Sequence, residues 1–299
     1  MPPVGLESLA DPRGRFAVLA MDQRGTLRRM LDAAGRPSEP DDMARFKTDV
    51  VGALAPLCSG VLLDAEYGVG AVRASGGLPD GVGLLVAADP AEKVLHDGEH
   101  RTVVDPSRNA AWVLAQGGHA LKFLVRWEPD RPADGGPDLA REALAAVRDV
   151  VADCRGTGVP SVIEPLVAFG PSVPEPAPRQ HARAVIRSAT LLAGLRPDLL
   201  KLEWPGGAEG CEEVTRALGP VPWALLSAGV SYEEFVERAR VALDAGASGV
   251  IAGRSLWGDA VRLPGAQRRD FLREVSVPRL QGLVEVLAEH GRSWKEAGR

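Results

Sequence analysis

Eight short apolar runs, each bounded by turn residues and separated by longer amphipathic stretches, constrain the fold more than any other feature of the sequence. This alternation is typical of parallel strands joined by helical crossovers. No glycine-rich dinucleotide fingerprint follows the first run, so a closed barrel is favoured over a doubly wound sheet. We predict one α/β domain over residues 1–299, a single (β/α)8 TIM barrel, with strands at Phe16–Met21, Gly60–Asp64, Val82–Ala87, Ala120–Val125, Ser161–Val167, Leu199–Glu203, Trp223–Ser227 and Gly249–Ala252.

Helical patterns occupy several of the intervening stretches. Asp138–Cys154 has a clear apolar stripe, and Ser231–Ala245 opens with Ser231 as an N-cap and Glu234 at the capping-box position. The stretch Ala266–Glu289 also has a helical pattern, and we expect it to pack as a cap or as a contact in a homo-oligomer.

Two Pro/Gly-rich pieces fall between a predicted strand and a helix. Pro129–Pro137 and Phe169–Pro178 are therefore predicted to be loops. The second follows the fifth strand and is a candidate for a lid over an active site.

Composition excludes several classes of partner. The net charge is -5 and the acidic and basic residues are interspersed, so a nucleic acid is not an expected partner. The cysteines Cys58, Cys154 and Cys211 are far apart and form no CxxC pair, so we expect neither a disulfide framework nor a metal site. Without a basic leader or an apolar stretch near the ~18 residues that span a bilayer, the chain is expected to be cytoplasmic rather than bound to a membrane.

Charged residues interrupt three of the predicted strands. Lys201 and Glu203 lie on one face of the sixth strand, Lys122 lies within the fourth and Glu164 within the fifth. In a barrel, alternate strand residues point inward, and catalytic groups lie near the carboxyl ends of the strands. Burying an unpaired charge costs several kcal/mol, so charges that converge on one barrel mouth imply mutual pairing or a ligand.

Two lysines near one another indicate imine chemistry. A lysine that is partly desolvated beside another cation has its pKa lowered toward roughly 7–8, which leaves neutral amine to attack a carbonyl. The alternative is that Lys201 and Glu164 form a structural ion pair while Lys122 points to solvent. The three residues together with the motifs below favour the catalytic interpretation.

The first predicted strand ends in a polar cluster, Asp22, Gln23 and Arg24, where the first loop of a barrel meets its substrate. Asp22 and Gln23 are candidates for binding hydroxyl groups, and Arg24, with Arg126 and Gln23, for binding an anion at the far end of a substrate. Alternatively, Asp22 is an ordinary helix N-cap.

The last two strands end in segments that are typical of a phosphate site. Ser227 and Gly229 follow the seventh strand, and Gly253 and Arg254 follow the eighth. Glycines let backbone N–H groups approach an anion, and an arginine supplies a bidentate fork. A plain turn is the alternative, but this is the usual phosphate position of such barrels.

Six segments, spread in order along nearly the whole chain, carry a resemblance to a known family: Ala20–Leu27, Leu62–Gly68, Leu121–Leu124, Leu200–Glu203, Leu226–Val230 and Ala252–Trp257. They resemble the class I aldolases that cleave tagatose 1,6-bisphosphate and sulfofructose 1-phosphate. The resemblance implies a (β/α)8 fold, a phosphorylated sugar as substrate, and cleavage to dihydroxyacetone phosphate (DHAP) and a three-carbon aldehyde. It also implies a lysine imine in place of a metal, with no cofactor.

The same resemblance implies roles for individual residues. Lys201, which precedes Leu202 and Glu203, corresponds to the lysine that forms the Schiff base. Glu164 corresponds to the proton carrier, and Lys122 to the second, pKa-lowering lysine, which acts with Asp22 around the carbinolamine. The site for the 1-phosphate corresponds to Ser227, Gly229, Gly253 and Arg254.

Segments typical of both branches of the family occur in the chain. Asp64–Gly68 and Ser227–Gly229 are similar to the tagatose bisphosphate branch, whereas Ile163–Val167 and Ala245–Gly249 are similar to the sulfofructose phosphate branch. We expect a tagatose 1,6-bisphosphate type of substrate, with a sulfofructose 1-phosphate aldolase giving DHAP and sulfolactaldehyde as the alternative. Another Schiff-base barrel enzyme, such as a deoxyribose-phosphate aldolase or a transaldolase, and a non-catalytic metabolite sensor are the remaining alternatives.

Overall fold

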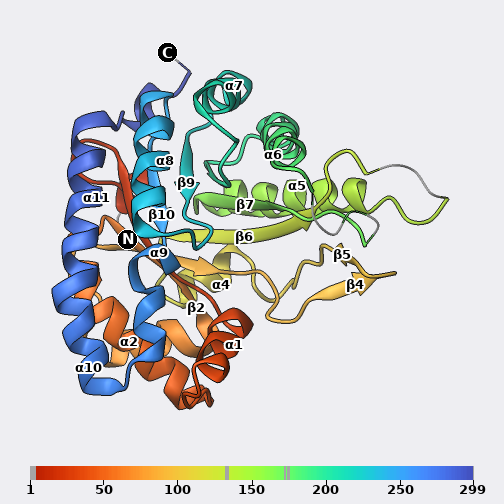
Figure 1. The fold of residues 1–299 in the computed structure, drawn as a ribbon. Helices are drawn as coiled ribbons and strands as arrows, with labels where there is room; N and C mark the ends of the chain where they lie inside the picture. Colours follow the sequence, from red (N-terminus) through yellow and green to blue (C-terminus); the bar gives the residue numbers. More distant parts are fainter. Residues whose placement is uncertain (1–4, 132–134, 172, 174–175, 299) are drawn as a thin grey trace.

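A computed structural model describes the chain except residues 1–4, 132–134, 172, 174–175 and 299. Its centre is a closed barrel of parallel strands in the order β1-β10-β9-β8-β7-β6-β3-β2 (Figure 1). This confirms the predicted (β/α)8 barrel. The barrel strands are β1 (Phe16–Met21), β2 (Gly60–Asp64), β3 (Gly83–Ala87), β6 (Ala120–Trp127), β7 (Ser161–Val167), β8 (Leu199–Leu202), β9 (Trp223–Leu226) and β10 (Gly249–Ala252).

The strand bounds differ slightly from the predicted ones. The third strand begins one residue later, and the fourth runs on to Trp127. The sixth strand ends one residue before Glu203, whose carboxylate accepts a hydrogen bond from the backbone amide of Val167 at 2.7 Å. This side-chain contact links the ends of β7 and β8 beyond their paired residues.

Helices cover the outside of the barrel (Figure 1). No helix among the described residues is both long enough and apolar enough to cross a membrane. The helices are α1 (Gly25–Ala33), α2 (Pro40–Leu54), α3 (Gly70–Ala74), α4 (Ala110–Ala115), α5 (Leu139–Thr157), α6 (Pro178–Ala193), α7 (Ala208–Leu218), α8 (Tyr232–Asp244), α9 (Arg254–Trp257), α10 (Gly265–Phe271) and α11 (Val277–His290).

The predicted helices are confirmed. The Asp138 carboxylate caps α5, and the Ser231 hydroxyl accepts a hydrogen bond from the Glu234 amide at 3.2 Å at the start of α8. The C-terminal helical stretch consists of α10 and α11 joined by a π-helical turn, Leu272–Ser276, and α11 packs against α8 in the outer layer.

Small side chains inside the barrel make room for long ones. The apolar interior, closed at one end by Leu6 and Leu9, includes Ala87 and Ala224, both fully buried. In the strand register Ala87 is the neighbour of Lys122, and Ala224 is the neighbour of Lys201. Each lysine therefore extends past an alanine into the space above the apolar interior.

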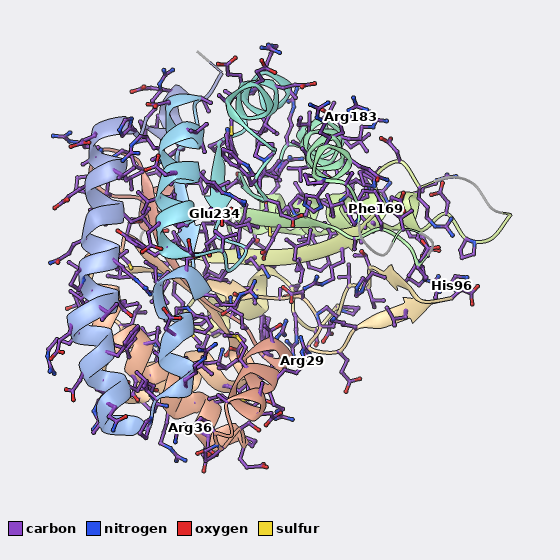
Figure 2. The ribbon with its side chains drawn as sticks, in the orientation of Figure 1. Arg29, Arg36, His96, Phe169, Arg183 and Glu234 are labelled. Carbon is purple, nitrogen blue, oxygen red and sulfur yellow. The ribbon has the colours of Figure 1, made fainter. Side chains whose placement is uncertain are left out.

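A β-hairpin that the sequence analysis did not predict projects beyond the end of β3 (Figure 1). Its strands are β4 (Val94–His96) and β5 (Glu99–Arg101), and the turn residues Asp97 and Gly98 both have positive φ, 49° and 84°. His96 on this hairpin and Phe169 after β7 lie on the same side of the molecule (Figure 2). The predicted lid around Phe169–Pro178 falls partly outside the described residues and stays a prediction.

Candidate active site

Lys122 is the centre of a buried cluster of charges at the carboxyl end of the barrel. It is 1% exposed, and its Nζ lies 2.9 Å from Asp22, 3.1 Å from Asp89 and 2.8 Å from Glu164. Burial alone would lower the pKa of Lys122, but the three carboxylates raise it above its ordinary value. The ammonium is therefore held in its charged form. The alternative in which Lys122 points to solvent is wrong.

Glu164 links Lys122 to the second lysine of the site. One carboxylate oxygen contacts Lys122, and the other lies 2.9 Å from the Nζ of Lys201, which is 4% exposed. A carboxylate within hydrogen-bond distance of an amine can exchange protons with that amine or with a group attached to it. The lysine pair and the carboxylate predicted from three separate strands are therefore brought into direct contact.

Asp22 does not cap a helix. Helix α1 begins at Gly25, and its N-cap residue is Arg24, whose side chain makes no capping hydrogen bond within the described chain. The Asp22 carboxylate instead accepts a hydrogen bond from Lys122. Burial acts to raise the pKa of Asp22, but the positive charges of Lys122 and Lys201 lower it well below the ordinary value, so Asp22 is held as a carboxylate.

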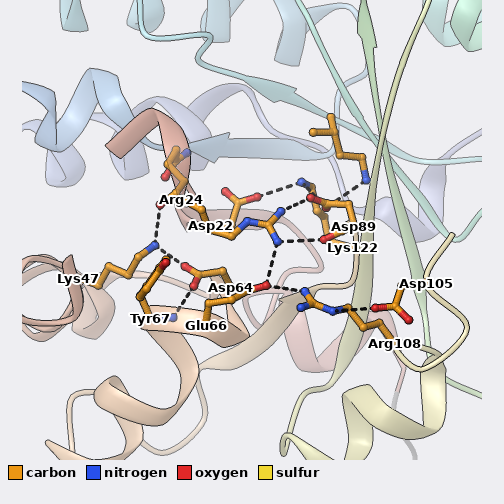
Figure 3. A network of polar contacts seen from close by, with 12 residues as sticks. Asp22, Arg24, Lys47, Asp64, Glu66, Tyr67, Asp89, Asp105, Arg108 and Lys122 are labelled. Carbon is orange, nitrogen blue, oxygen red and sulfur yellow. Dashed lines mark hydrogen bonds and ion pairs between the residues drawn. The ribbon is translucent and has the colours of Figure 1, made fainter. Parts of the chain in front are cut away.

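Gln23 and Arg24 lie in different environments. The Gln23 side-chain oxygen is buried without a hydrogen-bond partner among the described residues, and Gln23 lines the cavity beside Lys201. Arg24 forms ion pairs with Asp89 and with Glu66, and it donates to the Asp89 carbonyl at 2.9 Å (Figure 3). Both terminal nitrogens of Arg24 are thus occupied, and Arg24 orients the Asp89 carboxylate that contacts Lys122.

Sequence reasoning missed two charged residues of this region. Asp89, which follows β3, is the third carboxylate around Lys122. Lys47 on α2 is fully buried; it pairs with Asp64 and donates to the carbonyls of Met21 and Gln23 at 2.7 and 2.9 Å. Lys47 thereby fixes the backbone on both sides of Asp22, and Figure 3 shows it beside Asp64. The sequence feature that could have identified Lys47 is its place among the apolar residues that form the buried face of α2.

Three of the candidate phosphate residues, Ser227, Gly253 and Arg254, line a cavity beside Lys201, whereas Gly229 lines a neighbouring cavity on the other side of Arg254. The Ser227 hydroxyl accepts a hydrogen bond from the Gly253 amide at 3.3 Å, and Arg254 donates to the Ala228 carbonyl at 2.7 Å. Gly229 has φ of 86°, and a Cβ there would lie 2.9 Å from Cζ of Arg254. Glycine is therefore required at this position both by its conformation and by the close guanidinium.

Two adjoining cavities connect these groups. One of about 160 Å³ contains Lys201, Ser227 and Gly253, and one of about 580 Å³ extends from Lys201 past Lys122 toward the β4–β5 hairpin. Glu164, Lys201 and Arg254 line both. No group of three or more His, Cys, Asp or Glu residues that could hold a metal ion occurs among the described residues.

Comparisons with known proteins identify relatives of the chain. The chain matches the profile described as DeoC/LacD family aldolase over residues 16–259. It is 32% identical to a tagatose 1,6-diphosphate aldolase of Listeria monocytogenes serotype 4b, over 90% of this chain and 85% of the relative. It is also 29% identical to tagatose 1,6-diphosphate aldolase 2 of Streptococcus agalactiae serotype III, over 97% of this chain and 96% of the relative.

Solved structures share the fold. An archaeal fructose 1,6-bisphosphate aldolase superposes with a TM-score of 0.65 at 19% identity, over 95% of this chain and 99% of that chain. A Schiff-base-forming fructose-1,6-bisphosphate aldolase superposes with a TM-score of 0.64 at 20% identity, over 94% of this chain and 98% of that chain. These likenesses concern the barrel, whereas the profile and the closer relatives assign the family. The chain belongs to the DeoC/LacD family of class I aldolases.

Proposed function

We propose that Lys201 forms a Schiff base with a ketose 1-phosphate, of the tagatose 1,6-bisphosphate type, and that the enzyme cleaves it to DHAP and a three-carbon aldehyde. The observation that carries this proposal is the Glu164 carboxylate, which lies 2.9 Å from the Nζ of Lys201 and 2.8 Å from that of Lys122. It provides a proton carrier next to the nucleophile, in a cavity that also contains Arg254.

The reaction begins when the neutral amine of Lys201 attacks the C2 carbonyl of the open-chain sugar. Loss of water from the carbinolamine gives an iminium. Asp22 and Lys122 stay charged next to the site and stabilise the charges that form in this step. Glu164 then accepts the proton of the C4 hydroxyl as the C3–C4 bond breaks, and the bonding electrons move into the enamine. The aldehyde leaves, C3 is protonated, and water releases DHAP and restores Lys201.

The 1-phosphate is proposed to bind at the small cavity. Arg254 offers a guanidinium, Ser227 and Gly253 line the same cavity, and Gly229 lies against the guanidinium. A charge-assisted hydrogen bond is worth about 1.5–3 kcal/mol, so this end of the substrate would contribute a large share of the binding. Gln23, whose side-chain oxygen has no partner in the described part of the chain, is proposed to accept a hydrogen bond from a substrate hydroxyl.

The test is to trap the imine. Borohydride added in the presence of DHAP should inactivate the enzyme and add one DHAP-derived mass to the peptide containing Lys201. Lys201→Met should not be labelled, whereas Lys295→Met, at a lysine on the surface, should be labelled like the wild type. Label on Lys122, or no label, would contradict the proposal.

Product analysis separates the alternatives that imine trapping leaves open. DHAP released from tagatose 1,6-bisphosphate, fructose 1,6-bisphosphate and sulfofructose 1-phosphate identifies the sugar. Cleavage of a deoxyribose phosphate, or transfer of a three-carbon unit without DHAP release, would identify a different Schiff-base enzyme. Imine formation without turnover of any sugar would identify a sensor. Self-association and a cytoplasmic location stay predictions.

A further inference from the structure

Lys47 takes no direct part in the proposed reaction, yet it is a fully buried cation next to Asp22. Its ammonium pairs with Asp64 and donates to the carbonyls of Met21 and Gln23 at 2.7 and 2.9 Å. These two carbonyls flank Asp22, which lies between the end of β1 and the start of α1 and belongs to neither element. Lys47 therefore holds a stretch of backbone that is outside the regular structure on either side of it.

The exact place of Asp22 matters because its carboxylate contacts the central lysine of the site. The distance from Asp22 to the Nζ of Lys122 is 2.9 Å. Burial acts to raise the pKa of Asp22, whereas the positive charges of Lys122 and Lys201, and then that of Lys47, lower it. Lys47 thus acts on Asp22 in two ways, through the backbone on both sides and through its charge.

Asp64, the partner of Lys47, opens the sequence motif Asp64–Gly68. Its carboxylate also accepts a hydrogen bond from the Tyr67 amide at 2.7 Å, at the start of a π-helical turn. A Cβ at Gly68 would lie 3.3 Å from Oδ1 of Asp64, so a side chain there would crowd the carboxylate. The motif therefore builds a fixed anchor for the ammonium of Lys47.

Stability alone does not account for this buried pair. The side chains of Lys47 and Asp64 are both 0% exposed. Taking two charges out of water costs free energy that their attraction repays only in part, and apolar residues of similar volume are often at least as stabilising. The pair is better explained by what the ammonium holds, which is the segment that carries Asp22 (Figure 3).

We infer that Lys47 is a positioning residue that holds the Asp22 carboxylate against Lys122 during the steps that form the imine. The inference rests on the proposed function, in which Asp22 and Lys122 stabilise the charges that form as the carbinolamine loses water. Asp64 in turn anchors Lys47. The motif Asp64–Gly68 thereby acts on the reaction without contacting the substrate.

Loss of Lys47 should affect imine formation more than substrate binding. Without its ammonium, the carbonyls of Met21 and Gln23 lose a donor, and the backbone between them is free to move. Lys47 contacts these carbonyls and Asp64 rather than the proposed 1-phosphate residues beside Arg254. The rate of the imine step and the affinity for the 1-phosphate should therefore respond differently.

The test measures how fast the imine forms. Wild type and Lys47→Met are mixed with DHAP at several concentrations and quenched with borohydride after set times, and the labelled fraction of folded protein is measured by mass spectrometry. Lys47→Met should lower the rate at saturating DHAP by at least about tenfold, because displacing a catalytic group by about 1 Å can cost on the order of 10²-fold. The DHAP concentration that gives half the maximal rate should change by less than about threefold.

A double variant shows whether the effect passes through Asp22. Asp22→Asn should lower the saturating rate by itself. Adding Lys47→Met to Asp22→Asn should lower that rate by less than about a further threefold, because two residues that act through one group are not additive. A residue with a merely structural role would reduce the rate by the same factor in both backgrounds.

Arg15→Met is the matched control, because Arg15 makes the same kinds of contact at the other end of β1. Arg15 is buried, pairs with Asp11 and donates to the carbonyls of Leu287 and Ala288, each at 3.0 Å. The control variant should lose stability in urea unfolding and keep the wild-type rate of imine formation per folded molecule.

Asp64→Asn keeps the test valid where Lys47→Met does not fold, because Asn has the shape of Asp64 but lacks the charge that anchors Lys47. It should lower the saturating rate by at least about threefold, again without adding to Asp22→Asn. A wild-type rate in either variant, a loss no larger than that of Arg15→Met, or losses that add to Asp22→Asn would overturn the inference. Absence of a DHAP adduct on Lys201 in the wild type would instead overturn the proposed function.

Discussion

Replacing Lys122 with Met removes the positive charge that three buried carboxylates share. In the wild type, Lys122 pairs with Asp22, Asp89 and Glu164, while Lys201 also pairs with Glu164 and Arg24 pairs with Asp89 and Glu66. Lys122→Met leaves these carboxylates with one positive charge fewer in a site with little access to water. Removing one partner of a buried ion pair costs about 3–5 kcal/mol, so we expect the free energy of unfolding to fall by about 4 kcal/mol at pH 8.

The loss should depend on pH in a defined direction. In the wild type the pKa of Asp22 is lower in the folded protein than in the unfolded chain. The stability that Asp22 contributes is therefore fully present above the pKa of an unfolded Asp, near 3.9, and is lost as the pH falls through the lower pKa of the folded state. In Lys122→Met one carboxylate should instead have a raised pKa, by roughly three units for 4 kcal/mol. The folded variant then binds a proton that the unfolded chain does not, so acidification stabilises it relative to the wild type.

Urea unfolding followed by tryptophan fluorescence at pH 8 and at pH 5.5 measures both effects. We expect the m-value to be unchanged. The free energy of unfolding of Lys122→Met should fall short of the wild-type value by about 2 kcal/mol less at pH 5.5 than at pH 8. Lys295→Met is the control and should change stability by less than about 0.5 kcal/mol. A loss below about 1 kcal/mol for Lys122→Met, or the same loss at both pH values, would refute the charge pairing described above.

Three further predictions concern catalysis. Glu164→Gln should lower turnover by roughly 10²–10⁴ while DHAP is still trapped on Lys201, and a normal turnover would contradict its role as proton carrier. Gly229→Ala should displace Arg254, raise KM for ketose 1-phosphates and cost about 1–3 kcal/mol of stability, whereas Gly52→Ala, where a Cβ meets nothing within 4 Å, should be neutral or stabilising. Activity should survive EDTA because the Lys201 iminium is the proposed electron sink; chelator-sensitive activity restored by zinc would show a metal-dependent mechanism.

The residues that could be predicted from the sequence share one property: they break an apolar strand. Lys122, Glu164 and Lys201 could be placed together because parallel strands in a barrel bring their carboxyl ends to one rim. Predicting that these three residues lie together required no knowledge of the loops. The neighbouring alanines, Ala87 and Ala224, which provide the space, have no distinctive sequence signal.

The residues that were missed lie outside the strands, where alternation gives no information. Asp89 lies in a loop, and its position depends on Arg24, whose side-chain direction cannot be deduced from a pattern. Lys47 is on a helix whose apolar stripe it interrupts. The β4–β5 hairpin had a recognisable turn in Asp97 and Gly98, but its strands are short and exposed and lack clear alternation.

The hydrogen bonds between β1 and β10 also have a consequence for the order in which the chain is made. Phe16 on the first strand pairs with Gly249 on the last, so the first edge stays open until nearly the whole barrel has been synthesised. At roughly 5–20 residues per second, a ribosome takes on the order of ten to fifty seconds to cover that distance. During this interval one edge of β1 has no partner strand, and an open strand edge is the kind of surface that binds other chains. Closure of the barrel between β1 and β10 is therefore one of the last events of folding.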